Sequence, residues 1–349
     1  SRTRTERRCN MSIIEITYDK ALEGEEFNKI DISTIPSEII PVCPEKVSDW
    51  IDDGIEVEEE LVSLAKRIRE VALPALVDYF EFDQEIGGIR ATDLFSLNSL
   101  MGATIEDQVV NTLNKHRNTW DDGHWGEYTF VRSAQAFPDV RLVHRSNSED
   151  IKLGIELKSW FLLSKEGEPS MRFVPHPDAC AALDMVCVVP WYLSNAVCGK
   201  PQVARPWVQQ AKFATKWSMF FWQFLRQTDK ATTLESRKFK DIPLCSPYPK
   251  KSDNISLHPV NDSGGNYGRL PRYRPIMDTF CEEALNTEIL GIKAESWRYF
   301  LQIQTDSVTV NDIKKKLASK FGITDFSDSN RVIELISSVL RELPENLVR

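Results

Sequence analysis

The sequence predicts a mixed α/β protein, in which helices flank a central sheet and further helical regions lie at both ends of the chain. In the middle of the 349 residues, apolar positions change from helical spacing to strand-like runs and back. Helical spacing also returns on both sides of this series. The 42% hydrophobic and 27% charged residues are typical of a globular protein, which excludes a disordered, collagen-like or coiled-coil chain.

The region before the central series is acidic and mainly helical. Residues 1–10 are basic and patternless, and we expect them to be an extension in front of Met11. Residues 11–102 form the acidic region itself. Apolar residues at three- and four-residue intervals over 61–72 predict a helix, which Pro74 kinks or restarts.

Residues 103–226 form the predicted core. Its first helix has Thr104 as a plausible cap, and a short separate helix is expected just before it. The strand over 184–189 is a continuous apolar run after its first residue, as expected of a strand buried on both faces. The predicted elements are, in order, a helix over 103–117, strands over 128–137, 140–144, 152–160 and 184–189, and a long aromatic helix over 202–226.

The charge is distributed unevenly along the chain. Residues 11–93 hold 7 basic and 21 acidic side chains, a net charge of −14, although the whole chain carries only −9. Residues 200–275 hold 14 basic and 5 acidic side chains, a net charge of +9. Such asymmetry is typical of a protein with a polyanionic partner. The alternative is that acidic segments keep the protein soluble while basic ones decorate surface helices.

Two further regions follow the core: a basic, loop-rich region at 227–275 and a helical region at 276–349. The longest apolar run in the chain, over 185–193, contains a proline and is too short to span a membrane. The seven cysteines form no CxxC pair, the five histidines show no metal-ligand spacing, and no phosphate-binding glycine loop or serine-hydrolase elbow is present. We therefore expect a cytoplasmic protein without a membrane partner.

One group of charged residues points to chemistry. Asp139 opens the second predicted strand, and Glu156 and Lys158 lie in the third. Because strand side chains alternate, Glu156 and Lys158 share one face while Leu157 points to the other. If the two strands pair, two carboxylates and an ammonium group meet at one sheet edge. The alternative is a turn carboxylate beside a cross-strand ion pair, but charges within the apolar run 153–160 are costly unless they serve a purpose.

This grouping suits the hydrolysis of phosphodiester bonds. Two hard carboxylate ligands can hold Mg²⁺, which keeps most of its waters. The metal polarises the phosphate and lowers the pKa of a bound water. A neighbouring lysine can orient or deprotonate that water and offset the developing charge.

The motif Pro138-Asp139, followed by Glu156-Leu157-Lys158 on strands two and three after a helix, resembles the PD-(D/E)XK nuclease superfamily. The type II restriction endonucleases are its best-known members. The resemblance implies that Asp139 and Glu156 bind Mg²⁺ and that Lys158 assists the attacking water. It also implies a DNA endonuclease that leaves 5′-phosphate ends, acts as a homodimer on double-stranded DNA, and has a companion methyltransferase encoded nearby.

The resemblance covers the core at 103–226 and implies a restriction-endonuclease-like fold, a mixed central sheet flanked by helices. In this family an acidic residue on the first core helix often binds metal directly or through water, and Glu106 has that place. An exposed first-turn residue stabilised by the helix dipole fits Glu106 equally well. The sequence departs from the family pattern over 166–182, where no clear helix separates the third strand from the strand at 184.

Sequence recognition is expected from the basic residues outside the catalytic motif. Arginine and lysine side chains can contact phosphates or guanine edges, although solvated surface charges are the alternative reading. The candidate DNA-binding residues are Lys212, Lys216, Arg269, Arg272, Tyr273 and Arg274.

Other functions fit the same residues. A structure-specific repair or defence nuclease would need the same catalytic group, and a catalytically silent DNA-binding or interaction protein could share the fold. The acidic region at 11–93 could serve as a protein-binding module.

Overall fold

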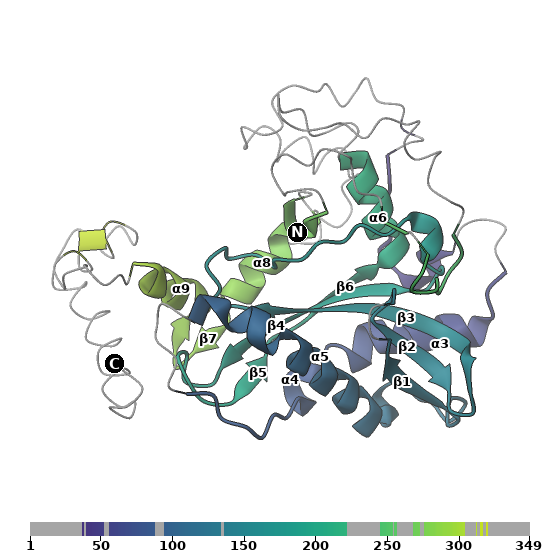
Figure 1. Cartoon of the computed structure of the whole chain (residues 1–349), viewed down its shortest axis with the longest axis horizontal. Helices are drawn as coiled ribbons and strands as arrows, with labels where there is room; N and C mark the ends of the chain where they lie inside the picture. Colours follow the sequence, from purple (N-terminus) through teal and green to yellow (C-terminus); the bar gives the residue numbers. More distant parts are fainter. Residues whose placement is uncertain are drawn as a thin grey trace, which may run out of the picture.

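The computed structural model shows a mixed sheet with helices on both faces (Figure 1). The structure describes residues 37, 40–51, 56–87, 94–133, 136–221, 245–253, 255–256, 268–272, 276–303, 312, 315–316 and 319. The extension at 1–10 therefore lies outside the described residues, as do most of the basic region at 227–275 and most of the chain after 303.

The central sheet follows the predicted order of three strands and one further strand. β1, β2 and β3 are antiparallel neighbours, and β4 runs parallel to β3. β5 and β6 then pair with successive halves of β4 on its other side. The strands are β1 (Tyr128–Arg132), β2 (Val140–His144), β3 (Asn147–Phe161), β4 (Met185–Leu193), β5 (Pro201–Val203) and β6 (Trp207–Gln210).

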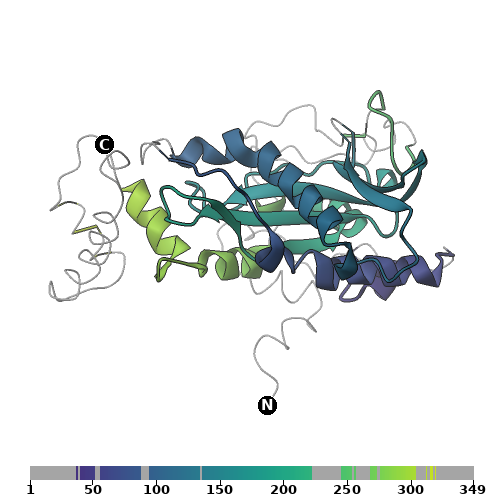
Figure 2. The same cartoon turned by 90° about the horizontal axis from the view of Figure 1, so that it is seen from below.

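Helices cover the sheet on both faces. In Figure 1, α4 and α5 lie below the sheet and α6 and α8 above it, while Figure 2 shows α5 in blue extending along the sheet. None of the described helices is long and apolar enough to cross a membrane. The α-helices are α3 (Glu59–Arg67), α4 (Leu76–Tyr79), α5 (Leu97–Lys115), α6 (Ala211–Phe220), α8 (Asp278–Leu285) and α9 (Ala294–Gln302), and a π-helical turn (Ile68–Ala72) follows α3.

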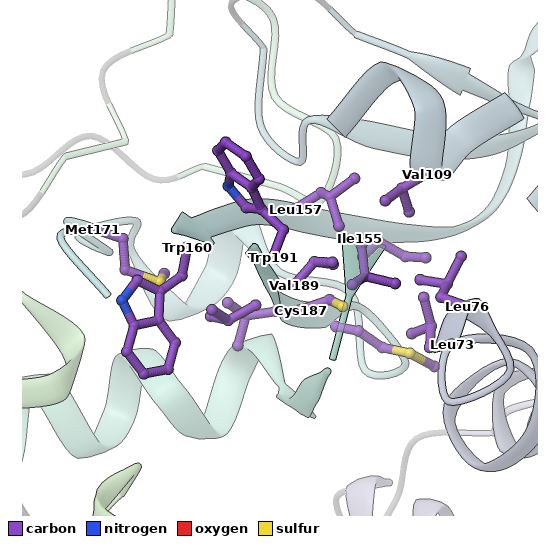
Figure 3. Packing of buried hydrophobic residues seen from close by; sticks show 14 of the residues in the cluster. Leu73, Leu76, Val109, Ile155, Leu157, Trp160, Met171, Cys187, Val189 and Trp191 are labelled. Atoms are coloured by element: carbon purple, nitrogen blue, oxygen red, sulfur yellow. The ribbon is translucent and has the colours of Figure 1, made fainter. Parts of the chain in front are cut away.

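The alternation of β3 decides which helix covers which face. Ile155 and Leu157 are buried and lie beside Val109 of α5 (Figure 3). Trp160 points the other way and packs against Phe280 of α8, with ring centroids 5.8 Å apart and the ring planes tilted by 58°. Burying a large apolar side chain stabilises a fold by roughly 1.5–3 kcal/mol, so this alternation fixes the register of β3 between two helical layers.

The first core helix differs from its prediction. α5 begins at Leu97, so the short helix expected before it is part of the same helix, and Thr104 lies inside it instead of capping it. Gly102 does not break the helix. A Cβ atom there would come within 3.0 Å of the Ser159 hydroxyl oxygen, so the glycine allows α5 to approach β3 closely.

The prediction of an aromatic helix over 202–226 was wrong for residues 202–210. Residues 201–203 and 207–210 form β5 and β6, because β4 needs partners along its second edge. Among the described residues of this stretch, 211–220 are α-helical and Phe221 caps the helix, while the predicted end at 222–226 lies outside the described residues. The helical spacing of the aromatic residues predicted a helix where β5 and β6 lie.

A hairpin divides the C-terminal helical pattern. β7 (Glu288–Ile289) and β8 (Ile292–Lys293) are joined by Leu290 and Gly291, whose φ angles of 53° and 75° are both left-handed. Two consecutive positive φ values are typical of a tight hairpin turn that follows the twist of its strands. The described part of the region is thus a helix, a hairpin and a second helix.

Polar side chains of α5 complete the edge of β3. β2 begins at Val140, opposite Ile155, so β3 continues beyond the end of β2. There the backbone N–H of Ser159 donates to the Glu106 carboxylate at 3.3 Å, and that of Phe161 donates to the Asn98 side-chain oxygen at 2.9 Å. Edge amides that would otherwise be buried without a partner are therefore satisfied by the helix.

Candidate active site

The three residues of the predicted catalytic group lie together on one face of the sheet. The Lys158 ammonium nitrogen is 2.5 Å from the Asp139 Oδ2 atom and 3.0 Å from the Glu156 Oε1 atom. The other Glu156 oxygen accepts a hydrogen bond of 3.1 Å from the backbone N–H of Asp139. The three side chains are 12–26% exposed, so the group is shielded but open to solvent.

Strand register brings this group together. Val140 pairs with Ile155, which places Asp139 beside Glu156 just where β2 begins. The preceding Phe137–Pro138 peptide is cis. A Cβ atom on residue 154 would collide with the ring of Pro138, so only glycine at this position lets the loop lie against β3.

Burial and charge oppose each other within the group. Desolvation raises the pKa of Glu156 to about 7, and Asp139 adds to the rise while Lys158 opposes it. Burial also disfavours the Lys158 ammonium, but the attraction of Glu156 and Asp139 outweighs this and raises the lysine pKa. Lys158 therefore stays charged and holds together two carboxylates that would otherwise repel each other.

Glu106 lies at the margin of this group. One of its oxygens accepts the Ser159 N–H, and the other is 3.3 Å from the guanidinium of Arg132. Burial, together with the charge of Asp139, raises the pKa of Glu106 against the attraction of Lys158 and Arg132. Glu106 thus lies close enough to Asp139 and Lys158 for their charges to affect its pKa, but its direct contacts are with Ser159 of β3 and Arg132 of β1.

The donor set of Asp139 and Glu156 fits a divalent cation. The Lys158 ammonium, itself a cation, contacts one oxygen of each carboxylate. One oxygen of Asp139 and one of Glu156 can therefore contact the same positive charge. Two carboxylates are hard ligands of the kind that Mg²⁺ prefers. Among the described residues, however, no three His, Cys, Asp or Glu side chains are placed to hold a metal ion.

A second buried carboxylate, which the sequence analysis missed, lies on the same face. Asp184 comes directly before β4 and accepts hydrogen bonds from the backbone N–H groups of Gly154, at 2.7 Å, and Ala181, at 2.8 Å. The Tyr248 hydroxyl also donates to it, at 3.1 Å. Burial raises the pKa of Asp184 to about 7 in spite of these bonds and of the Arg141 charge. An acidic residue opening an otherwise apolar strand was the signal that could have found it.

The residues predicted to bind DNA are spread over several elements. Lys212 and Lys216 lie on α6, with Lys212 partly buried and Lys216 exposed. Arg269 is 3.3 Å from the carboxylate of Glu166. Arg272 ends a short 3-10 helix, and its side chain lies outside the described part. The remaining two, Tyr273 and Arg274, also fall outside the described residues.

Comparison of the chain with protein-family models, with curated proteins and with solved structures gives no match.

Proposed function

We propose that this protein is a Mg²⁺-dependent endonuclease that hydrolyses phosphodiester bonds in double-stranded DNA. The observation that carries the proposal is the convergence of Asp139, Glu156 and Lys158, in which one cation lies between two carboxylates on paired strands. The arrangement is similar to the restriction-endonuclease-like core of the PD-(D/E)XK superfamily. A site-specific type II restriction enzyme is the form of nuclease that we favour.

In this proposal each side chain has a separate task. Asp139 and Glu156 hold Mg²⁺, which polarises the phosphate and lowers the pKa of a bound water when present. Lys158, once released from one of its carboxylates, orients the attacking water or donates to a phosphate oxygen. Glu106 lies at the margin of this group and supports β3 by accepting a hydrogen bond from the Ser159 N–H.

The order of the strands supports the proposal. A short β2 leaves one edge of β3 uncovered by strand just past Ile155, and Glu156 and Lys158 project from this part of β3. A substrate phosphate can reach side chains at such an edge, whereas the middle of a covered sheet face would exclude it. The described part of the basic region at 200–275 includes Tyr248, whose hydroxyl donates to Asp184, and the net positive charge of this region would attract a polyanion.

Plasmid cleavage in Mg²⁺ tests the proposal. We expect discrete fragments from the wild type, and a loss of about 10³-fold or more in rate for Glu156→Ala and for Lys158→Ala. Glu81→Ala and Lys115→Ala are matched controls, because they remove the members of an exposed ion pair of 2.7 Å away from the site. Both controls should cleave at the wild-type rate.

The other outcomes separate the alternatives. Cleavage limited to branched or damaged DNA would indicate a structure-specific nuclease with the same residues. Binding of DNA without cleavage of unmodified, methylated or branched substrates would contradict the enzyme proposal and indicate a catalytically silent binding protein.

A further inference from the structure

A short loop outside the core is bound tightly to the catalytic sheet. The hydroxyl of Tyr248 donates to the buried Asp184 carboxylate, which in turn accepts the N–H of Gly154 in β3. The guanidinium of Arg141 lies over the Tyr248 ring, 5.6 Å from its centroid. A part-buried hydrogen bond and a cation–π contact together fix the ring position.

Arg141 connects this loop to the segment that carries Asp139. Its Nη2 atom donates to the backbone oxygen of Phe137 at 2.6 Å and lies 3.4 Å from that of Pro249. Phe137 is two residues before Asp139, and Pro249 directly follows Tyr248. The loop and the catalytic segment therefore share one anchoring side chain.

The backbone of the loop is restricted as well as anchored. Tyr248 has a left-handed φ of 58°, which is uncommon for a residue other than glycine. Prolines 247 and 249 on either side of it limit the chain further. Strain of this kind persists only where the surroundings determine the conformation, and here the part-buried hydrogen bond to Asp184 does so.

The anchored loop ends in an exposed turn that carries two lysines. The N–H of Lys250 donates to the Asp253 carboxylate at 2.8 Å, and the N–H of Asp253 donates back to the Lys250 carbonyl at 2.9 Å. The carboxylate of Asp253 is thus used to close the turn. Lys250 and Lys251 are both exposed at its tip.

We propose that this turn, residues 249–253, is a contact for the phosphates of duplex DNA, with Lys250 and Lys251 as the contacting residues. The inference rests on the proposed function. Its basis is that two adjacent cations stand on a rigid support, and that this support is bonded to the segment holding Asp139. A lysine held in this way can set the register of the phosphate backbone relative to the catalytic carboxylates, which a mobile surface lysine cannot do.

The salt dependence of DNA binding tests this assignment. We would measure the affinity of the full chain for a duplex in EDTA over a range of salt concentrations, for the wild type and for Lys250→Gln/Lys251→Gln. Each phosphate contact contributes about 0.9 to the magnitude of the slope of log K against log salt. The slope measured for the double variant should therefore be smaller in magnitude by about 2 than that of the wild type. Lys66→Gln/Lys293→Gln removes the same charge from exposed positions on α3 and β8 and should keep the wild-type slope.

A charge-conserving variant completes the test. Lys250→Arg/Lys251→Arg should restore the wild-type slope, because arginine also contacts phosphate. An unchanged slope in the Gln variant, or an equal loss in the control variant, would overturn the assignment of this turn while leaving the proposed nuclease intact. A wild-type protein that binds no duplex DNA at any salt concentration would contradict the proposed function itself.

Discussion

Glu156 and Asp184 are carboxylates on the same sheet face, the first largely and the second fully buried, and burial raises the pKa of each to about 7. Their partners differ. Asp184 accepts two backbone N–H groups and a tyrosine hydroxyl, all held by the fold. Glu156 faces a lysine side chain that it shares with Asp139. A similar pKa shift therefore accompanies two different kinds of site.

The partners of a buried acid indicate whether it can change its contacts. Neutral donors fixed on the backbone can satisfy a carboxylate permanently, and such a carboxylate supports structure. Charged side chains that converge with partial exposure can exchange one partner for another, as catalysis requires. The partners, more than the pKa, separate Glu156 from Asp184.

The largest expected effect on stability is at Lys158. Lys158→Met leaves Asp139 and Glu156 facing each other without a cation, which should lower the free energy of unfolding by about 3 kcal/mol in EDTA. Adding Mg²⁺ or Mn²⁺ should raise the melting temperature of the variant more than that of the wild type, because the cation no longer competes with the lysine. Thermal unfolding with and without metal measures both effects.

The exposed ion pair supplies the control for this prediction. Lys115→Met removes a lysine whose partner, Glu81, lies at 2.7 Å on the surface, and it should leave the melting temperature unchanged. If Lys158→Met and Lys115→Met were equally stable in EDTA, the stability of the fold would not depend on the ammonium between Asp139 and Glu156.

A smaller effect is expected at Asp184. Its folded pKa of about 7 lies above the ordinary value of 3.8, so its contribution to stability is complete below pH 4 and is lost as the pH rises through 7. Between pH 5 and pH 8 the wild type should lose roughly 2–3 kcal/mol through this group. Asp184→Asn cannot ionise, and urea unfolding should show a shallower pH dependence. The same slope in both proteins would mean that Asp184 is not the titrating group.

The smallest effect is expected at Glu106. Like Asp184 it accepts a backbone N–H, and like Glu156 it lies beside a cationic side chain. Glu106→Gln keeps an oxygen for the Ser159 N–H and loses only the charge beside Arg132. We expect little change in melting temperature and a fall of about tenfold or less in DNA cleavage. Inactivity as complete as that of Glu156→Ala would make Glu106 an equal metal ligand.

The sequence predicted that Asp139, Glu156 and Lys158 meet because the signal for this grouping is local. Alternation within β3 places Glu156 and Lys158 on one face whatever surrounds them, and Asp139 needed only the pairing of β2 with β3. The predictions for 202–210 were wrong because helical spacing of aromatic residues competes with a requirement that no local window contains. β4 has a second edge to satisfy, and only the assembled sheet reveals it.

Spacing and composition alone predict the order of the first core helix and of β1 to β4, the sheet face shared by Glu156 and Lys158, and the charge asymmetry of the chain. The partners of each acid depend on the tertiary structure. Asp184, Tyr248 and Arg141 come from three distant segments, and Glu106 contacts a strand 53 positions further along. Such partners meet only after the chain has folded, since hydrogen bonds depend on positions in space and not on separation along the sequence.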